Sequence, residues 1–249
     1  AHGSFDGDVC FMRKDGSPVW ARVQGRGVRA HDMAGGTVWI LEDLTAAREA
    51  QQQQDWAAIH DPLTQLCNRE AFVQRMGVLL AERSARARTP GVEAVDAAEG
   101  EGDGVMLFLD LDHFTVVNDL AGHDAGDDVL RHVARLLESQ VRQIGWAARL
   151  GGDEFAVVLP GCSLVRGQAL AEQLRAAVQA WEPSYQGRSF TLGVSIGLVV
   201  LDASLQDVPS VLYAADMACY DAKRAGRNRV ETRHADQAAA SGRMALGPV

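Results

Sequence analysis

The sequence is short of basic residues: 24 Lys and Arg stand against 33 Asp and Glu, which gives a formal net charge of −9. A protein that binds nucleic acid over a broad surface needs a basic face to neutralise phosphates, so this charge argues against a nucleic-acid partner. It is compatible with one bound nucleotide, because a few Lys or Arg side chains and a divalent cation can neutralise a triphosphate locally.

Long apolar runs and closely spaced cysteines are also absent. No stretch approaches the roughly 20 apolar residues of a membrane span, and the N-terminus lacks the basic-then-apolar pattern of a secretion signal. The four cysteines are far apart, without CxxC spacing, which favours free thiols. We therefore expect a cytoplasmic protein with no membrane contact in these residues. Because residue 1 is not Met and falls close to an expected strand, we also expect preceding sequence, through which the full-length protein could be membrane-attached.

The first segment with a recognisable pattern, residues 8–43, is predicted to form β structure. Asp15-Gly16 and Ala34-Gly35-Gly36 separate apolar runs, and glycine accepts the positive φ of hairpin turns. We predict three strands, which are too few to enclose a core. Thr45 is a candidate N-cap for a helix that continues towards His60. Its apolar seam is mainly alanines and Trp56, so it is either a solvated linker helix or a weak, switchable dimer contact.

From Asp61 onwards the pattern is typical of an α/β protein. Helices are predicted over 69–88, 114–121, 124–141, 163–180 and 209–225, and strands over 105–109, 145–150, 155–159 and 189–201. Asn68 and Gly226 are the expected caps of the first and last of these helices. Residues 89–104 have the composition of a flexible acidic insertion. The order from residue 105 to residue 201 is β-α-α-β-β-α-β, which fits an α/β (α+β) fold with a palm-like central sheet and helices on one side.

Two pairs of acidic residues are the candidate metal-binding groups. Asp110 and Asp112 end a buried strand and, two residues apart, point to the same side of it. Asp153 and Glu154 follow two glycines in a predicted hairpin. In a palm-like sheet these elements are neighbours, so the carboxylates could share one or two magnesium ions with nucleotide phosphates.

The chain resembles the GGDEF family of diguanylate cyclases over about residues 60–231. The resemblance is carried by motifs in order: Asp61-Pro62-Leu63-Thr64-Gln65-Leu66-Cys67-Asn68-Arg69, Asp110-Leu111-Asp112-His113-Phe114, Asn118-Asp119, Gly122-His123-Asp124-Ala125-Gly126-Asp127, Arg149-Leu150-Gly151-Gly152-Asp153-Glu154-Phe155, Ser195-Ile196-Gly197, Ala215-Asp216-Met217-Ala218-Cys219-Tyr220-Asp221-Ala222-Lys223 and Gly226-Arg227-Asn228. It implies an enzyme that joins two GTP molecules into cyclic di-GMP at the interface of a two-fold homodimer.

The resemblance also implies roles for single residues. Asp110, Asp153, Glu154 and the Leu111 backbone carbonyl would bind Mg²⁺, with Mn²⁺ as an alternative, and Glu154 could instead activate the ribose 3′-hydroxyl. Asn118 and Asp127 would read guanine, while Lys223 and Arg227, one helical turn apart, would hold phosphates. The remaining expected substrate contacts are Gly151, Gly152, Phe114 and Thr115. Asp112 would either share the magnesium with Asp110 or only form a cap or a salt bridge.

The segment from about residue 5 to residue 48 resembles the C-terminal part of a PAS sensor domain, through Arg13-Lys14-Asp15-Gly16-Ser17-Pro18-Val19-Trp20 and Glu42-Asp43-Leu44-Thr45. The expected organisation is a PAS-like part over 1–45, a linker helix over 46–60, the GGDEF domain over 61–231 and a disordered tail over 232–249.

Two positions depart from the family pattern. Thr115 stands where a phosphate-binding Lys is usual, and Gly145 replaces the Asp of the inhibitory RxxD site, of which only Arg142 remains. We therefore expect weaker GTP binding, little inhibition by product, and a gain of inhibition in Gly145→Asp. The alternative functions are a catalytically silent GGDEF module that signals through a partner, and a cyclase that makes a mononucleotide.

Overall fold

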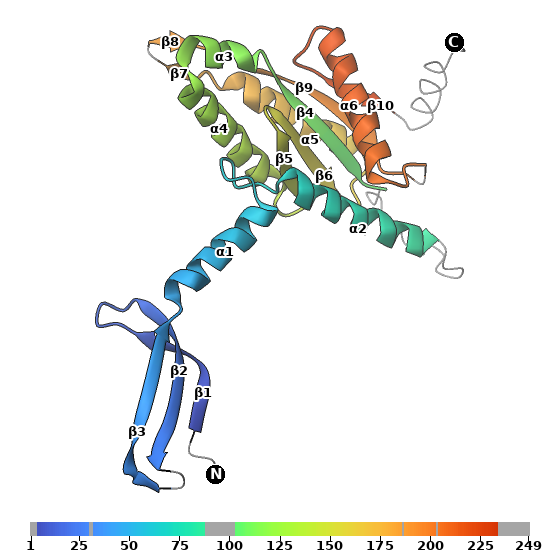
Figure 1. Ribbon diagram of the computed structural model, residues 1–249. Helices are drawn as coiled ribbons and strands as arrows, with labels where there is room; N and C mark the ends of the chain where they lie inside the picture. Colours follow the sequence, from blue (N-terminus) through green and yellow to red (C-terminus); the bar gives the residue numbers. More distant parts are fainter. Residues whose placement is uncertain (1–3, 30–31, 88–102, 186, 203, 234–249) are drawn as a thin grey trace, which may run out of the picture. The chain divides into compact units, whose positions relative to one another are not determined.

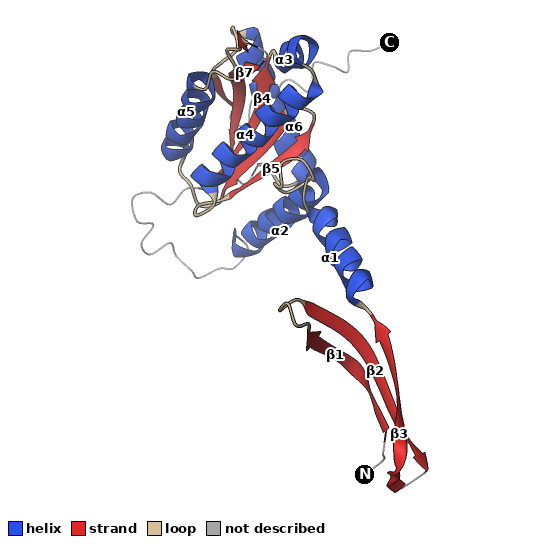
Figure 2. Cartoon of the chain, turned by 90° about the vertical axis from the view of Figure 1, so that its left-hand side faces the viewer, coloured by secondary structure: helices blue, strands red, loops and turns tan. Residues whose placement is uncertain are grey.

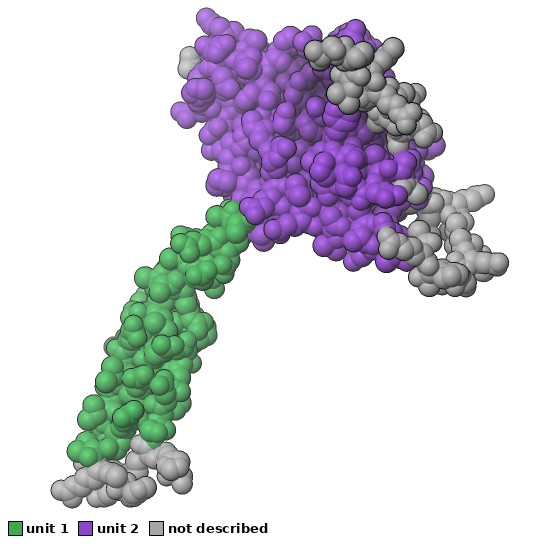
Figure 3. Space-filling view, turned by 45° about the vertical axis from the view of Figure 1, so that its right-hand side comes forward, with its two compact units in different colours: residues 1–58 green, residues 59–249 purple. Residues whose placement is uncertain are grey.

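The computed structural model describes residues 4–29, 32–87, 103–185, 187–202 and 204–233. The chain forms two compact units, residues 1–58 and residues 59–249 (Figure 3). Most of the predicted acidic insertion and the tail beyond residue 233 lie outside the described residues.

The first unit contains a three-stranded antiparallel sheet in the order β1 (Ser4–Met12), β2 (Pro18–Arg29) and β3 (Asp32–Asp43). The predicted turn at Asp15-Gly16 is confirmed, and Gly16 has a φ of 84°. The second predicted turn, at residues 34–36, is wrong because these residues belong to β3 and the chain reverses between Arg29 and Asp32. Gly25 on β2 pairs with Trp39 on β3, and the tryptophan ring occupies the space that a β-carbon at Gly25 would need.

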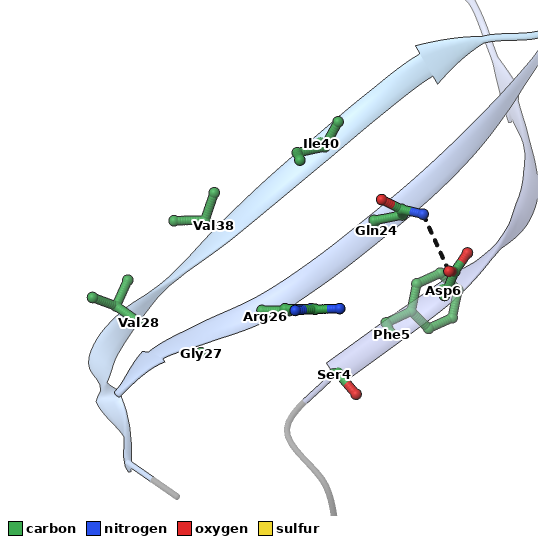
Figure 4. A pocket seen from close by; sticks show the side chains of 9 residues that line it. All are labelled: Ser4, Phe5, Asp6, Gln24, Arg26, Gly27, Val28, Val38 and Ile40. Carbon is green, nitrogen blue, oxygen red and sulfur yellow. Dashed lines mark hydrogen bonds between the residues drawn. The ribbon is translucent and has the colours of Figure 1, made fainter. Parts of the chain in front are cut away.

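A hollow of about 360 Å³ lies on this sheet (Figure 4). Its polar lining includes Gln24, which donates a hydrogen bond to Asp6 over 3.1 Å. Val28, Val38 and Ile40 supply its apolar lining and are each at least 57% exposed, so the hollow is open to solvent.

Helix α1 (Thr45–Ile59) follows β3. The expected cap is corrected, because Asp43 Oδ1 accepts from the Thr45 N–H, while the Thr45 hydroxyl accepts from the Trp20 N–H. No residue of α1 is buried in this chain, and Trp56 and Ile59 are largely exposed.

The second unit is built on a five-stranded sheet in the order β10-β9-β4-β6-β5. Its strands are β4 (Val105–Asp112), β5 (Trp146–Gly151), β6 (Glu154–Leu159), β9 (Gly193–Val200) and β10 (Val230–Arg233). β4 is central and antiparallel to both neighbours, while β10 pairs with β9 in parallel. The predicted strand over 189–201 is in fact β9 and one strand of a small hairpin formed by β7 (Ser184–Tyr185) and β8 (Arg188–Ser189), and β10 was not predicted.

Helices cover both faces of this sheet, which corrects the expectation that they lie on one side (Figures 1 and 2). One face packs against α3 (Phe114–Ala121), α4 (His123–Val141) and α5 (Leu164–Ala180), and the other against α2 (Arg69–Ala87) and α6 (Val208–Arg224). Successive residues of β4 alternate between the two cores, with Leu107 and Leu109 on the first and Met106 and Phe108 on the second.

The predicted caps of α2 and α6, which are Asn68 and Gly226, are both confirmed. Asn68 Oδ1 accepts from the Ala71 N–H over 2.9 Å at the start of α2, and Gly226 follows α6 with a φ of 119°. The four cysteines are free thiols, as expected. No helix within the described ranges has the length and apolar character to cross a membrane.

Candidate active site

Asp110 lies near the end of β4, on the face covered by α6, and is 9% exposed. Its Oδ2 atom forms an ion pair of 2.6 Å with Lys223 Nζ at the end of α6. The helix can come this close because of Gly197 on β9, where a β-carbon would overlap the backbone of Ala215 and Cys219 in α6. Lys223 is therefore beside the carboxylate of the central strand.

Asp112 is more deeply buried, at 3% exposure, and is used differently. Its Oδ1 accepts from the Ser195 hydroxyl and its Oδ2 from the Asn228 backbone N–H, each over 2.8 Å. Both oxygens of Asp112 are therefore engaged in hydrogen bonds, and Asp110 is the metal candidate on this strand.

The second acidic pair lies on the neighbouring hairpin. Glu154 stands opposite Asp110 in the β4–β6 register, and the Asp153 carbonyl accepts from the Leu111 N–H over 3.4 Å. Gly151 and Gly152 have positive φ, and a β-carbon on either would meet no atom within 4 Å. The hairpin therefore leaves open space at these two glycines, next to Asp153 and Glu154 in the chain.

The charges of this group act on one another. Burial raises the pKa of the Asp110 carboxyl, as does Asp153, and Lys223 opposes this shift only in part. Partial burial together with the charges of Asp110 and Asp216 also raises the pKa of Glu154. The pKa of Lys223 is lowered by burial but raised more by Asp110, so that it remains a cation.

The donor set fits a magnesium ion. All its atoms are carboxylate or carbonyl oxygens, and Mg²⁺ at nucleotide sites takes one or two carboxylates and completes its shell with phosphates and water. Among the residues that the structure describes, no three His, Cys, Asp or Glu side chains are grouped closely enough to hold a metal ion by themselves. Nucleotide phosphates and water would supply the remaining ligands of such an ion.

A second group of candidates gathers where α3 meets α4. Asn118 is half-buried on α3, and its amide lies against Gly126 of α4, where a β-carbon would overlap it. Phe114 is the other neighbour of Gly126. Asp127 follows on α4, and its carboxylate is 3.5 Å from the Arg131 guanidinium. An amide and a carboxylate are therefore presented by adjacent helices at the start of α4.

The prediction that Arg227 lies one helical turn beyond Lys223 is wrong. α6 ends at Arg224, and both Arg227 and Asn228 lie in the turn after it with φ of 64° and 45°. The helix was predicted to end at residue 225 with Gly226 as its cap, and a residue beyond that cap cannot lie on the same helix. Arg227 is exposed and so remains available to a phosphate.

The comparisons with known proteins agree with this geometry. The family model described as "Diguanylate cyclase, GGDEF domain" matches residues 58–229. The chain belongs to this family.

Three relatives illustrate the likeness of this GGDEF domain. It is 36% identical to "Probable diguanylate cyclase DgcE" of Escherichia coli over 82% of this chain and 17% of that protein, and 38% identical to "Diguanylate cyclase DgcP" of Pseudomonas aeruginosa over 76% and 26%. The crystal structure of the coiled coil and GGDEF domain of DgcB from Caulobacter crescentus, in complex with c-di-GMP, has a TM-score of 0.66 and 29% identity, covering 76% of this chain and 93% of that one. The chain therefore spans about a quarter or less of the length of these two curated relatives.

Arg149 of the GGDEF signature holds the β5–β6 hairpin, a role that the sequence reasoning missed. Its guanidinium donates to the Gly152 carbonyl over 2.8 and 3.0 Å and to Asp61 Oδ1 over 3.0 Å. Asp61 also accepts from the Thr64 N–H and hydroxyl. Burial raises the pKa of Asp61, but the hydrogen bonds of Thr64 and Arg149 lower it more, so the net shift is downward. Arg149 and Asp61 both belong to motifs that carry the family resemblance, and neither had an assigned role. A polar motif residue without a role was the signal from which this contact could have been predicted.

The two departures from the family pattern differ in structure. Thr115 is exposed in the first turn of α3, where a longer side chain has room. Gly145 is packed against β6, and a β-carbon there would overlap the Val158 carbonyl oxygen. An aspartate at position 145 would require this backbone to shift, so the packing opposes the expected gain of inhibition in Gly145→Asp. Arg142 is exposed at the end of α4.

Proposed function

We propose that this chain is a diguanylate cyclase, which condenses two GTP molecules into cyclic di-GMP and two pyrophosphates. The observation that carries the proposal is the placement of Asp110 and Glu154 opposite each other on β4 and β6, with Lys223 on Asp110. Carboxylates and a cation beside the open space of a glycine hairpin are suited to a nucleoside triphosphate.

A two-fold dimer supplies the second half of the site, because the product is itself two-fold symmetric. The 3′-hydroxyl of each GTP attacks the α-phosphorus of the other, so two new P–O bonds form in turn, and at each phosphorus the bond to pyrophosphate breaks. The hydroxyl proton passes to a carboxylate. Glu154 is suited to accept it because its raised pKa makes it more basic than an ordinary glutamate.

Mg²⁺, or Mn²⁺ in its place, held by Asp110, Asp153, Glu154 and the Leu111 carbonyl, would neutralise phosphate charge when bound. If Glu154 acts as a metal ligand, another base must take the proton. Lys223 and Arg227 would hold the phosphates, and Gly151 and Gly152 would let them approach the backbone.

Guanine would be read by Asn118 and Asp127, since an amide and a carboxylate can satisfy its O6 acceptor and its N1 and N2 donors. Gly126 supports this assignment, because it holds the Asn118 amide against α4. Phe114 and Thr115 would border the same substrate.

Regulation belongs to the proposal as well. The three-stranded sheet of the first unit would be the C-terminal part of a PAS-like sensor, and α1 would carry its signal to the GGDEF domain. The partners are therefore GTP and a second copy of the chain.

The test is incubation with GTP and Mg²⁺, followed by mass spectrometry of the products at several protein concentrations. Cyclic di-GMP with pyrophosphate is expected, and the activity per protomer should rise with concentration until the dimer is populated. A cyclic mononucleotide, or no turnover at any concentration, would reject the proposed activity. Constant activity per protomer well below the dimer dissociation constant would reject the shared site.

A further inference from the structure

The turn after α6 has a backbone that its sequence does not favour. Arg227 and Asn228 are consecutive left-handed residues, with φ of 64° and 45°. Asparagine adopts this conformation more readily than most residues, but arginine does so rarely. The Arg227 N–H donates to the Ala222 carbonyl of α6 over 3.0 Å, and the Arg227 carbonyl accepts from Arg229 Nε over 3.4 Å. Further contacts hold the next residue, Asn228.

Asp112 supplies the first of these contacts. It accepts from the Asn228 N–H through Oδ2, while the buried Ser195 hydroxyl fixes its other oxygen. Gly193 makes the room, because a β-carbon there would lie 2.9 Å from Asp112 Oδ2 and 3.2 Å from Asn228 Cβ. The central strand thus reaches the turn directly.

Arg175 on α5 supplies the second contact. Its Nη1 donates to Asn228 Oδ1 over 3.2 Å. Arg175 is itself fixed by hydrogen bonds to Glu172 and Gln179 on the same helix. Asn228 is held through its backbone by β4 and through its side chain by α5.

We propose that Asp112 is a positioning residue for the substrate triphosphate, which acts through Asn228 to fix Arg227. The inference rests on the proposed function, in which Arg227 binds phosphate. Within the described part of the chain Arg227 forms no ion pair, and its side chain is exposed. The two carboxylates of β4 then have different roles. Asp110 forms an ion pair with Lys223, and Asp112 stabilises the conformation of the turn that contains Arg227.

The experiment is a double-mutant cycle on the full chain. The measured quantity is the affinity for guanosine 5′-(α,β-methylene)triphosphate with Mg²⁺, because this analogue binds without turnover. Asp112→Ala and Arg227→Ala should each weaken binding at least about tenfold, the effect of losing a hydrogen bond to a charged group. The double variant should bind no more weakly than Arg227→Ala alone. Losses that multiply in the double variant would overturn the inference.

Matched variants separate this role from charge and from metal binding. Arg224→Ala removes the same charge outside the turn, and its effect should simply multiply with that of Asp112→Ala. Asp112→Asn should bind nearly as well as the unmodified chain, because its amide oxygen can still accept from Asn228. If Asp112→Asn loses magnesium-dependent activity while the Asn228 amide stays protected, Asp112 is a metal ligand and the inference is wrong.

Amide hydrogen exchange at Asn228 tests the contact without any nucleotide. Exchange should be faster in Asp112→Ala than in the unmodified chain, and unchanged exchange would reject the inference even if GTP is the substrate. If Asp112→Ala does not fold, Asn228→Ala serves in the same cycle, since it removes the Arg175 contact and disfavours the left-handed turn. An unmodified chain that does not bind the analogue rejects the proposed function, and this inference with it.

Discussion

Lys223 Nζ lies 2.6 Å from Asp110 Oδ2, so the cation that we assign to phosphate also neutralises the carboxylate that we assign to magnesium. Without a bound metal, this ion pair offsets part of the cost of burying Asp110 beside Asp153. Metal binding at Asp110 must therefore compete with Lys223, whereas a triphosphate gives the lysine a new partner.

This competition leads to the first prediction. Lys223→Met should bind Mn²⁺ a few-fold more tightly than the unmodified chain in the absence of nucleotide at pH 8. It should bind the GTP analogue at least about tenfold more weakly, because a charge-assisted hydrogen bond is lost. Calorimetry with each ligand measures both effects, and Arg224→Met is the matched control for net charge. Unchanged binding of both ligands would remove Lys223 from the site.

Asp153→Ala should abolish the formation of cyclic di-GMP and leave the fold intact. Asp153 is partly exposed on the hairpin, so its removal opens no cavity in the core. Product formation and the thermal unfolding midpoint are the two measurements, with the exposed Asp119→Ala as a control that should keep its activity. A folded Asp153→Ala variant with full activity would contradict the assigned mechanism.

Thr115→Lys should lower the Michaelis constant for GTP. The side chain is exposed in the first turn of α3, so a lysine there can extend without strain. If its ammonium reaches a phosphate, a gain of about 1.5–3 kcal/mol is expected, which is tenfold or more. Steady-state kinetics measures it, and Thr115→Met controls for side-chain length. No improvement over Thr115→Met would mean that Thr115 lies outside the phosphate site.

Asp61→Asn should destabilise the GGDEF domain at neutral pH by about 1–3 kcal/mol, because Arg149 loses an ionised partner. The folded protein lowers the pKa of Asp61 below its ordinary value of 3.8, so ionised Asp61 stabilises the fold above that pH. This contribution is lost as the pH falls through the lowered pKa. Urea unfolding of both proteins from pH 7 to pH 3 should show the difference shrinking in the acid range. A difference that is independent of pH would show that the charge of Asp61 is not what matters.

Product binding should be weak, because Arg142 has no carboxylate beside it at position 145. Calorimetry with nucleotide-free protein should detect little binding at micromolar cyclic di-GMP. Tight binding that disappears in Arg142→Ala would disprove this expectation. Gly145→Asp should lower the thermal unfolding midpoint rather than create a site, since its β-carbon would overlap the Val158 carbonyl.

The sequence could predict the central strand, because seven consecutive residues from Val105 to Leu111 include only one that is not apolar. It could not predict which face each helix covers, because periodicity identifies a buried side of a helix but not the side of the sheet that it meets. β10 has only four residues and no apolar run, and its strand conformation depends on pairing with β9, a contact that the local sequence does not encode.

The candidate site, like the fold, could be predicted from the sequence only in part. Motifs marked Asp110, Asp153, Glu154 and Lys223 in advance, and the structure brings Asp110 together with Glu154 and Lys223. The division between Asp110 and Asp112 depends on Ser195 and Asn228, which lie more than 80 residues away in the sequence. Such contacts exist only in the folded chain, so residue spacing could not separate the two roles.

The contact between Arg149 and Asp61 spans 88 positions of the sequence and bears on how this domain can be dissected. A fragment that started at α2 would retain every helix and strand packed on the central sheet. It would lack Asp61, however, so Arg149 of the GGDEF hairpin would lose its ion pair. The smallest fragment able to hold that hairpin therefore begins at or before Asp61, eight residues ahead of its first helix.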